Sequence, residues 1–192
     1  MHDPDETAVD DAVRAVRAGD RNAFAVVVAR YQRRMFALAM MITRDPSGAE
    51  EVAQEALVRA FERLHLYDAR RPFSPWMATI TVRTAQNWMA KRSRMTALEG
   101  DALSPNGAAP GHADPLDALI VGEGDRELWR AVSALSAGQR TVVMLRYRQD
   151  MSVREIAGAL GVTAGTVKTL LFRARQRLRF ALGEANAERD PR

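Results

Sequence analysis

The chain has 192 residues, 47% of them hydrophobic, and a formal net charge of +4. This length allows one or two domains with apolar cores, and the absence of cysteine excludes a disulfide framework, a thiolate metal site and cysteine redox chemistry. Because the histidines are scattered and neither a nucleotide-binding glycine loop nor a metal-ligand cluster is evident, we expect no catalytic residue, no metal and no cofactor.

The N-terminal segment, MHDPDETAVDD, is acidic, whereas a secretory signal begins with basic residues and continues into an apolar stretch. The longest strongly apolar run, residues 36–42, is far too short to span a bilayer. We therefore expect a cytoplasmic protein without membrane insertion, and we interpret residues 1–19 as an acidic N-terminal tail.

Helical periodicity recurs along the chain, and the alternation typical of strands is almost absent. We predict an all-α protein with two small helical domains joined by a flexible acidic linker. The first domain is predicted at residues 20–95. Its first helix follows apolar positions from Phe24 to Ile42 and ends near Asp45, because a residue before proline avoids the α region.

Two further helices complete the predicted first domain. The second helix, AEEVAQEALVRAFERL, follows a capping pair formed by Ser47 and Glu50. The third begins at Ser74 and carries Trp76 and Trp88 on an apolar stripe. Tryptophans at helical spacing are more often core residues than stacking platforms for bases, so the stripe by itself indicates packing.

Charge changes sign after this third helix. Residues 83–94 contain bases and no acid, which is the pattern of a surface that follows a polyanion, although a solvated helix face has the same composition. Residues 96–125 contain six acids and no Lys or Arg, with three prolines and five glycines, and they form the predicted linker. Two interpretations of the linker stay open: a tether kept soluble by its charge, or a mimic of nucleic acid in a basic channel.

The second domain is predicted at residues 126–182. Helices resume at Glu127, and a later helix begins with a capping pair formed by Ser136 and Gln139. Residues 183–192 are interpreted as a frayed C-terminal tail.

The end of this domain has the pattern of a helix-turn-helix. Ser152 and Glu155 form a capping box for a short helix, and Gly161 can adopt the left-handed conformation that ends it. Thr163 is a plausible cap for the next helix, whose residues 168–179 contain bases and no acid. One face of that helix can pack while the other contacts phosphate.

Three segments together carry a family resemblance: AEEVAQEALVRAF, PWMATITVRTAQNWMAKRSR and LSAGQRTVVMLRYRQDMSVREIAGALGVTAGTVKTLLFRARQRLR. They resemble bacterial sigma factors of the extracytoplasmic-function group over about residues 20–182. The resemblance implies an initiation factor without catalytic chemistry that docks on core RNA polymerase and binds promoter DNA. Its first domain would open the downstream promoter element, and its second would read the upstream element. An anti-sigma factor is an expected further partner.

The resemblance also implies roles for individual residues. The surface that binds core polymerase would contain Glu51, Gln54, Glu55 and Arg59. The downstream element would be contacted by Arg71, Phe73, Trp76, Arg83, Asn87, Lys91, Arg92 and Arg94. The upstream element would be contacted by Thr163, Thr166, Lys168, Thr169, Phe172, Arg173 and Arg175. Phe172 is equally compatible with a core position.

The chain departs from the family pattern at three places. Arg83 stands where the family often has Asn, Asn87 where it often has Asp, and Ala90 with Lys91 where it often has two bases. The sequence preference at the downstream element is therefore not carried over.

Two other classes of protein compete with this interpretation. A helix-turn-helix regulator of response-regulator type would share the C-terminal module, but it needs a receiver or sensor domain that residues 1–95 do not suggest. A helical adaptor that binds only protein would not need the two acid-free basic segments. Salt-dependent association with DNA separates the adaptor from the DNA-binding classes.

Overall fold

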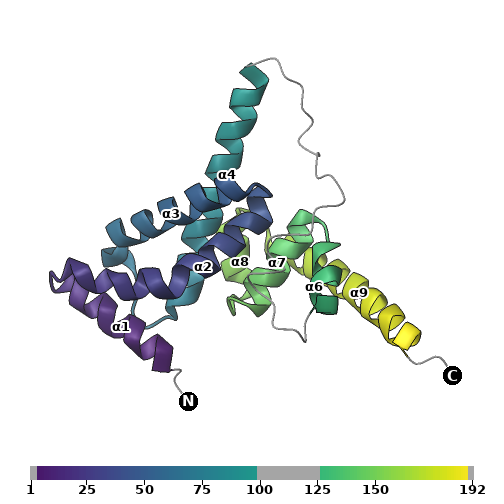
Figure 1. The fold of residues 1–192 in the computed structure, drawn as a ribbon, viewed down its shortest axis with the longest axis horizontal. Helices are drawn as coiled ribbons and strands as arrows, with labels where there is room; N and C mark the ends of the chain where they lie inside the picture. The colour runs from purple at the N-terminus through teal and green to yellow at the C-terminus, as the bar shows by residue number, and fades with distance from the viewer. Residues whose placement is uncertain (1–3, 99–125, 190–192) are drawn as a thin grey trace. The chain divides into compact units, whose positions relative to one another are not determined.

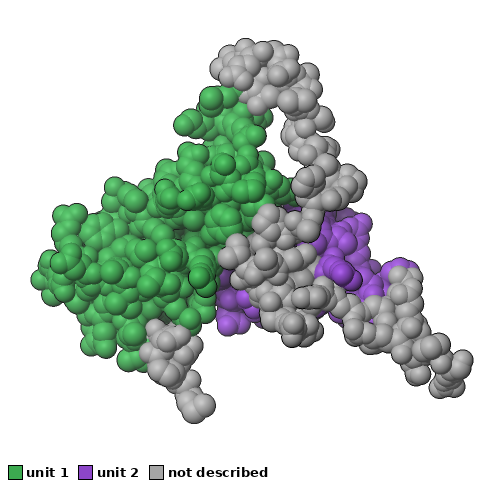
Figure 2. Space-filling view, viewed as in Figure 1, with its two compact units in different colours: residues 1–103 green, residues 104–192 purple. Residues whose placement is uncertain are grey.

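The structure, a computed structural model, describes residues 4–98 and 126–189, and over these ranges every regular element is a helix. The chain divides into two compact units, residues 1–103 and 104–192 (Figure 2). The predicted all-α fold is confirmed. The helices, labelled in Figure 1, are α1 (Pro4–Arg17), η1 (Arg21–Ala23), α2 (Phe24–Thr43), α3 (Pro46–Glu62), η2 (Leu64–Leu66), α4 (Phe73–Leu98), α6 (Arg126–Ser133), α7 (Ala137–Tyr147), α8 (Val153–Leu160) and α9 (Ala164–Arg189).

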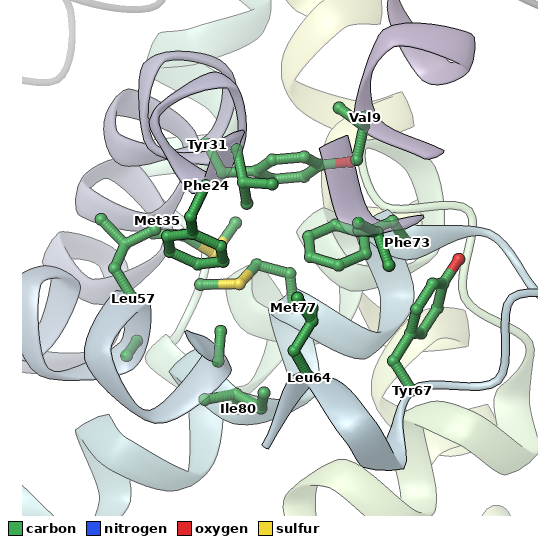
Figure 3. Packing of buried hydrophobic residues seen from close by; sticks show 14 of the residues in the cluster. Val9, Phe24, Tyr31, Met35, Leu57, Leu64, Tyr67, Phe73, Met77 and Ile80 are labelled. Atoms are coloured by element: carbon green, nitrogen blue, oxygen red, sulfur yellow. The ribbon is translucent and has the colours of Figure 1, made fainter. Parts of the chain in front are cut away.

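The first unit has one hydrophobic core shared by α1, α2, α3 and α4. Val27, Met35 and Met77 are fully buried at its centre. At one end, the Phe73 ring lies edge-on to Tyr31 and Tyr67, with centroids 5.2 and 5.0 Å apart (Figure 3). These aromatic pairs join the start of α4 to α2 and to the segment before α4.

The N-terminal segment corrects our interpretation of residues 1–19 as a tail. Pro4–Arg17 forms α1, and Val9, Ala12 and Val13 lie in the core with 3, 5 and 1% exposure. Their spacing places all three side chains on one face of a helix. Over its described residues, 4–98, the first unit therefore contains four α-helices where we predicted three.

The start of α3 also differs from the prediction. Asp45, not Ser47, is the N-cap: its backbone is extended, and its carboxylate accepts a 2.9 Å hydrogen bond from the Gly48 amide. Pro46 occupies the first turn, where its missing N–H costs nothing. Arg44, in the left-handed region with φ of 54°, separates α2 from α3.

The boundaries of α4 are wider than expected. The helix begins at Phe73, one position before the predicted Ser74, and continues to Leu98. The first three residues of the predicted linker, 96–98, thus belong to a helix. The remainder of the linker, residues 99–125, lies outside the described residues.

The second unit packs α6, α7 and α8 against α9. Its core includes Val142, Leu145, Ile156, Val167 and Leu171, all at most 1% exposed. The predicted capping boxes at the starts of α7 and α8 are both present. The long helix α9 continues to Arg189, so the predicted frayed tail, residues 183–192, is mostly helical.

Within the described ranges, no single helix combines the length and apolarity required to cross a bilayer. Val153–Leu160 and Ala164–Leu182 satisfy those requirements only when they are counted together across a 109° bend.

Candidate nucleic-acid interface

A helix-turn-helix lies in the second unit, formed by α8, a three-residue turn and α9. The two helices meet at 109°, within the range of about 90–120° that such motifs show. Gly161 ends α8 in the left-handed region with φ of 69°, where glycine has no steric penalty. At the other end of α8, the Ser152 amide donates to the Glu155 carboxylate over 2.8 Å, and the Glu155 amide donates to the Ser152 hydroxyl over 3.2 Å.

The α9 helix has a buried face and an exposed face. Val167, Leu171 and Ala174 point into the core with at most 1% exposure. Phe172 is 60% exposed, which removes the alternative that it is a core residue. The predicted upstream-element residues on the outward side of α9 are all exposed: Thr166, Lys168, Thr169, Phe172, Arg173 and Arg175.

Thr163 and Thr166 cap the start of α9. The Thr166 amide donates to the Thr163 hydroxyl over 3.1 Å, and the two hydroxyls are 2.9 Å apart. The first turn of a helix presents backbone N–H groups and the positive end of the helix dipole, both of which attract phosphate. Thr163 therefore both fixes the start of the recognition helix and lies where DNA backbone is expected.

In the first unit, the C-terminal half of α4 displays the predicted downstream-element residues. Arg83, Asn87, Lys91, Arg92 and Arg94 are all exposed. Trp76 is half-buried, with its ring 5.3 Å from Tyr67 and 5.2 Å from Phe73. Part of its surface remains available for contact with a base.

Phe73 does not fit the direct DNA contact that we expected. Its side chain is 4% exposed and lies among Tyr31, Tyr67 and Trp76. A buried ring can support the residues around it but cannot stack on a base without leaving the core. Phe73 is thus part of the hydrophobic core of the first unit.

A hollow of about 240 Å³ lies between the C-terminal end of α3 and α4. Trp76 and Arg83 from α4 line it together with Arg59 from α3 and Arg63, the residue that follows α3. Arg59 donates two hydrogen bonds to Glu55, at 2.9 and 2.6 Å. Arg59, which was assigned to the polymerase surface, thus lines the same hollow as Trp76 and Arg83, which were assigned to DNA. Three guanidinium groups around one half-buried tryptophan suit a nucleotide, since the ring can stack and the cations can meet phosphate.

A second hollow, of about 160 Å³, lies between α1 and the segment before α4. Tyr31 and Phe73 provide aromatic walls, while Asp10, Arg70 and Arg71 provide hydrogen-bonding groups. Arg71 was predicted at the downstream element, and the structure places it at the mouth of an aromatic hollow. Because both rings are almost fully buried, the polar groups of Asp10, Arg70 and Arg71 rather than the ring faces are the groups that could contact a base in this hollow.

The segment 67–72 that borders this hollow is folded on itself. The Tyr67 hydroxyl donates to the Arg71 carbonyl, and Asp68 accepts 2.9 Å hydrogen bonds from the Arg70 guanidinium at both of its carboxylate oxygens. The bonds from Arg70 hold the pKa of Asp68 at about 2, and burial raises the pKa of Tyr67 to about 12. Tyr67 therefore stays neutral and Asp68 stays ionised at physiological pH.

Comparison with known proteins identifies the family. A model described as "Sigma-70 region 2" matches residues 27–95, and one described as "Sigma-70, region 4" matches residues 125–178, so that the two cover more than half of the chain. The chain is 29% identical to "ECF RNA polymerase sigma factor SigW" of Bacillus subtilis over 92% of its length and 98% of the relative's. This chain belongs to the extracytoplasmic-function sigma factors. Members of this family act in promoter-specific initiation of transcription and are not enzymes.

Other relatives of this sigma factor agree. It is 29% identical to the "ECF RNA polymerase sigma-E factor" of Escherichia coli, over 85% of its own length and 88% of the relative's. It is 32% identical to the "Probable RNA polymerase sigma factor RfaY" of Xanthomonas campestris pv. campestris over 86% of its length. The match spans only 42% of that last relative.

Two solved structures share the fold of the sigma factor. One is the sigma factor RpoE in complex with the anti-sigma factor NepR from Bartonella quintana, with a TM-score of 0.62, 23% identity and coverage of 83% of this chain and 96% of that one. The other is CnrH in complex with the cytosolic domain of CnrY, with a TM-score of 0.57, 22% identity and coverage of 92% and 98%.

Some assigned residues of the sigma factor are engaged inside the first unit. The Trp88 indole donates a 2.8 Å hydrogen bond to the carboxylate of Glu51. Arg92 pairs with Asp45 and lies 5.2 Å from the centroid of the Trp88 ring. Glu51 and Arg92 therefore hold α3 and α4 together. Gln54, by contrast, is exposed on the outer face of α3 beside the partly exposed Glu55.

Two structural arginines were not indicated by any pattern in the sequence. Arg17 donates to the carbonyls of Leu64 and Tyr67, and Arg177 donates to the Gln139 side chain over 3.1 Å. Both partners are distant along the chain, so neither contact leaves a local pattern. For Asp45 a signal was present, since Asp followed by Pro at a helix start is typical of a cap.

Proposed function

We propose that this sigma factor binds core RNA polymerase, opens promoter DNA at a downstream element and reads an upstream element. The observation that carries the proposal is the exposed face of α9, where Lys168, Thr169, Phe172 and Arg173 lie side by side opposite a fully packed apolar face. A helix presented in this way enters the major groove of DNA.

Reading of the upstream element is assigned to α9. Arg173 and Lys168 can contact guanine O6 and N7 or phosphate, and Thr169 with Phe172 can meet base edges and the thymine methyl group. Arg175 lies further along the helix and is assigned to the DNA backbone. Phosphate contacts fix the register, and base contacts supply the specificity.

Opening of the downstream element is assigned to α4 and the segment 67–72. Extrusion of a base from the stack costs a few kcal/mol, which aromatic stacking and phosphate contacts offset. The hollow bordered by Tyr31 and Arg71 would receive the extruded base. The basic side chains of α4, Arg83, Lys91 and Arg94 among them, would follow the melted strand.

Binding to core polymerase is assigned to the outer face of α3, with Gln54 and Glu55 as the central residues. The relatives of this chain are named as RNA polymerase sigma factors, which supports the same partner here. One of the two solved structures with this fold contains an anti-sigma factor, so we also propose a protein of that kind as a regulator. A factor that works on polymerase and chromosomal DNA acts in the cytoplasm.

Transcription with purified components tests the proposal. Core polymerase with fragmented genomic DNA of the source organism should yield new transcripts that start at discrete positions only when the chain is added. The same assay with Gln54→Ala and Glu55→Ala combined should lose these transcripts because polymerase is no longer bound. Failure of the unmodified chain to associate with core polymerase would refute the proposal.

A further inference from the structure

The segment 67–72 is tied to a helix that lies far away along the chain. Arg17, in the last turn of α1, donates from Nη2 to the Leu64 carbonyl over 2.7 Å and from Nε to the same oxygen over 3.2 Å. Its Nη2 also donates to the Tyr67 carbonyl, and the guanidinium carbon lies 5.8 Å from the Tyr67 ring centroid. One side chain therefore holds the backbone at the start of the segment and covers its aromatic residue.

The α1 helix is a firm support for Arg17. Val9, Ala12 and Val13 anchor it in the hydrophobic core with at most 5% exposure. Val9 is labelled in Figure 3. The same helix provides Val9 and Asp10 to the wall of the hollow that faces the segment. One side of the hollow is therefore formed by α1, which is anchored in the core, and the opposite side is formed by residues 69–72 of the segment.

Inside the segment, the contacts do not locate it relative to α1. The Tyr67 hydroxyl bonds to the Arg71 carbonyl, and Asp68 bonds to Arg70, so these groups stay together when the segment moves as one body. Arg17 crosses from α1 to the Leu64 carbonyl, 47 residues away and just before the segment, and to the Tyr67 carbonyl, 50 residues away at the first residue of the segment. These hydrogen bonds join α1 to the start of the segment, in addition to the core packing of Tyr67 and Phe73.

We propose that Arg17 is a positioning residue for base capture: it holds the segment 67–72 at the distance from α1 that a single extruded base requires. The inference rests on the proposed function of the hollow and adds a specificity role for α1. A hollow that is already shaped before binding loses less conformational entropy when the base enters, and it rejects bases of the wrong shape. Arg17 touches the backbone of the segment and not the base.

Three variants separate this role from a general effect on stability. Arg17→Ala removes the contacts, and Arg17→Lys keeps the charge but replaces a planar fork by a single ammonium group that cannot reproduce them. Arg14→Ala is the matched control, because Arg14 lies one turn earlier on α1, is 72% exposed and pairs with Asp11 on the same helix.

The assay uses core polymerase bound to the full-length chain. The holoenzyme selects from a pool of short single-stranded DNA randomised at its central positions, and sequencing gives the preference at each position. 2-Aminopurine placed at the most strongly selected position then reports extrusion of that base by its fluorescence. Hydrogen exchange of the amides of residues 66–71 reports the mobility of the segment.

Arg17→Ala should lower the preference at the captured position by about tenfold, which is close to the loss of one hydrogen bond from a charged donor. Exchange in residues 66–71 should rise while the α2 and α3 amides and polymerase affinity stay unchanged. The base preference and the exchange rate of Arg17→Lys should lie between those of Arg17→Ala and those of the unmodified chain. Both quantities in Arg14→Ala should equal those of the unmodified chain.

Two results would overturn the role of Arg17 and leave the proposed function of the sigma factor intact. The first is normal base preference in Arg17→Ala despite faster exchange in the segment, and the second is an equal loss of preference in Arg14→Ala. If the unmodified holoenzyme shows no selected position and no 2-aminopurine signal, base capture itself fails and the inference fails with it.

Discussion

Arginines in this sigma factor serve two different purposes that composition does not separate. Arg173 is exposed on the outward face of α9 and is assigned to DNA, whereas Arg177, one turn later, donates to Gln139 of α7. Arg146 donates over 2.9 Å to the Met151 carbonyl just before α8 and so supports the helix-turn-helix. The basic residues 168–179 thus include both side chains assigned to DNA, such as Arg173, and side chains that form hydrogen bonds within the domain, such as Arg177.

Substitution of these residues should give distinct results. Lys168→Ala and Arg173→Ala should each weaken holoenzyme binding to the upstream element, by about 1–3 kcal/mol where a base contact is lost. Loss of a phosphate contact should also lower the dependence of log affinity on log salt by about one unit. Filter binding at several salt concentrations measures both quantities.

The control for this pair is Arg177→Ala. It should lower the thermal stability of the second domain and leave the upstream sequence preference unchanged, because its contact is internal. If Lys168→Ala and Arg173→Ala lose only polymerase binding, the assignment of α9 to DNA is incorrect.

Two glycines should respond oppositely to alanine. A Cβ at Gly48 would lie 2.3 Å from the Trp88 ring, so Gly48→Ala should lower the free energy of unfolding of the first domain by about 1–3 kcal/mol. Gly158 lies within α8 with open space around its Cα, so Gly158→Ala should raise the stability of the second domain by about 0.5–1 kcal/mol. Urea unfolding followed separately for each domain measures both changes, and a stabilising Gly48→Ala would contradict the close packing.

At the scale of elements, helix ends connect the two assigned surfaces of the first domain. Asp45 caps α3, which carries the proposed polymerase surface, and pairs with Arg92 of α4, which carries the proposed DNA surface. Trp88 of α4 packs over Gly48 and bonds to Glu51 on α3. The start of α3 and the exposed half of α4 are therefore held as one unit.

Asp45 variants separate the cap from the ion pair. Asp45→Ala removes both and should lower the free energy of unfolding of the first domain by about 1 kcal/mol, whereas Asp45→Asn keeps the cap and should lose less. The hydrogen bond from Gly48 and the nearby Arg92 lower the pKa of Asp45 from 3.8.

A carboxyl whose pKa is lowered by folding stabilises the folded state above its unfolded pKa. This stabilisation should disappear as the pH falls from about 4 towards the lower folded pKa, and the difference between the unmodified chain and Asp45→Ala should shrink with it. Thermal unfolding between pH 6 and pH 3 follows the difference. A gap that stays constant over this range would show that the carboxylate charge is not involved.

At the scale of the whole molecule, the chain carries two small recognition modules. A single helix-turn-helix without a dimer partner buries about 600–1,000 Å², which gives little selectivity against a genome of competing sites. When both modules are mounted on polymerase, the second engagement becomes intramolecular and the combined affinity rises. Division of the chain into two units fits this use.

The unbound chain should therefore be a weak DNA binder. Its affinity for duplex promoter DNA should be at least about 100-fold lower without core polymerase than with it. Fluorescence anisotropy of a labelled promoter at fixed salt gives both affinities, and the α9 variants should weaken both. Equal affinity in the two states would show that polymerase does not supply the scaffold.

Much of the fold follows from the sequence, and the reasons are local. The capping boxes at Ser136 and Ser152 and the left-handed Gly161 were predicted because each involves groups within a few residues, where backbone geometry brings them together. The α1 helix was missed because its acids suggested a tail, and only the buried face of Val9, Ala12 and Val13 against the core stabilises it. Apolar residues at helical spacing predicted the other α-helices, but not the start of α3, the bounds of α4 or the end of α9.

The sequence by itself determined that the chain is helical, has two domains and carries a helix-turn-helix with an exposed basic face, since periodicity and caps act over one or two turns. Only the tertiary structure decided that Phe73 is buried, that Arg59 lines the hollow with Trp76, and that Arg17 donates to the carbonyls of Leu64 and Tyr67. These contacts join residues up to 50 positions apart. Their existence depends on how the helices pack, and a local pattern contains no information on that packing.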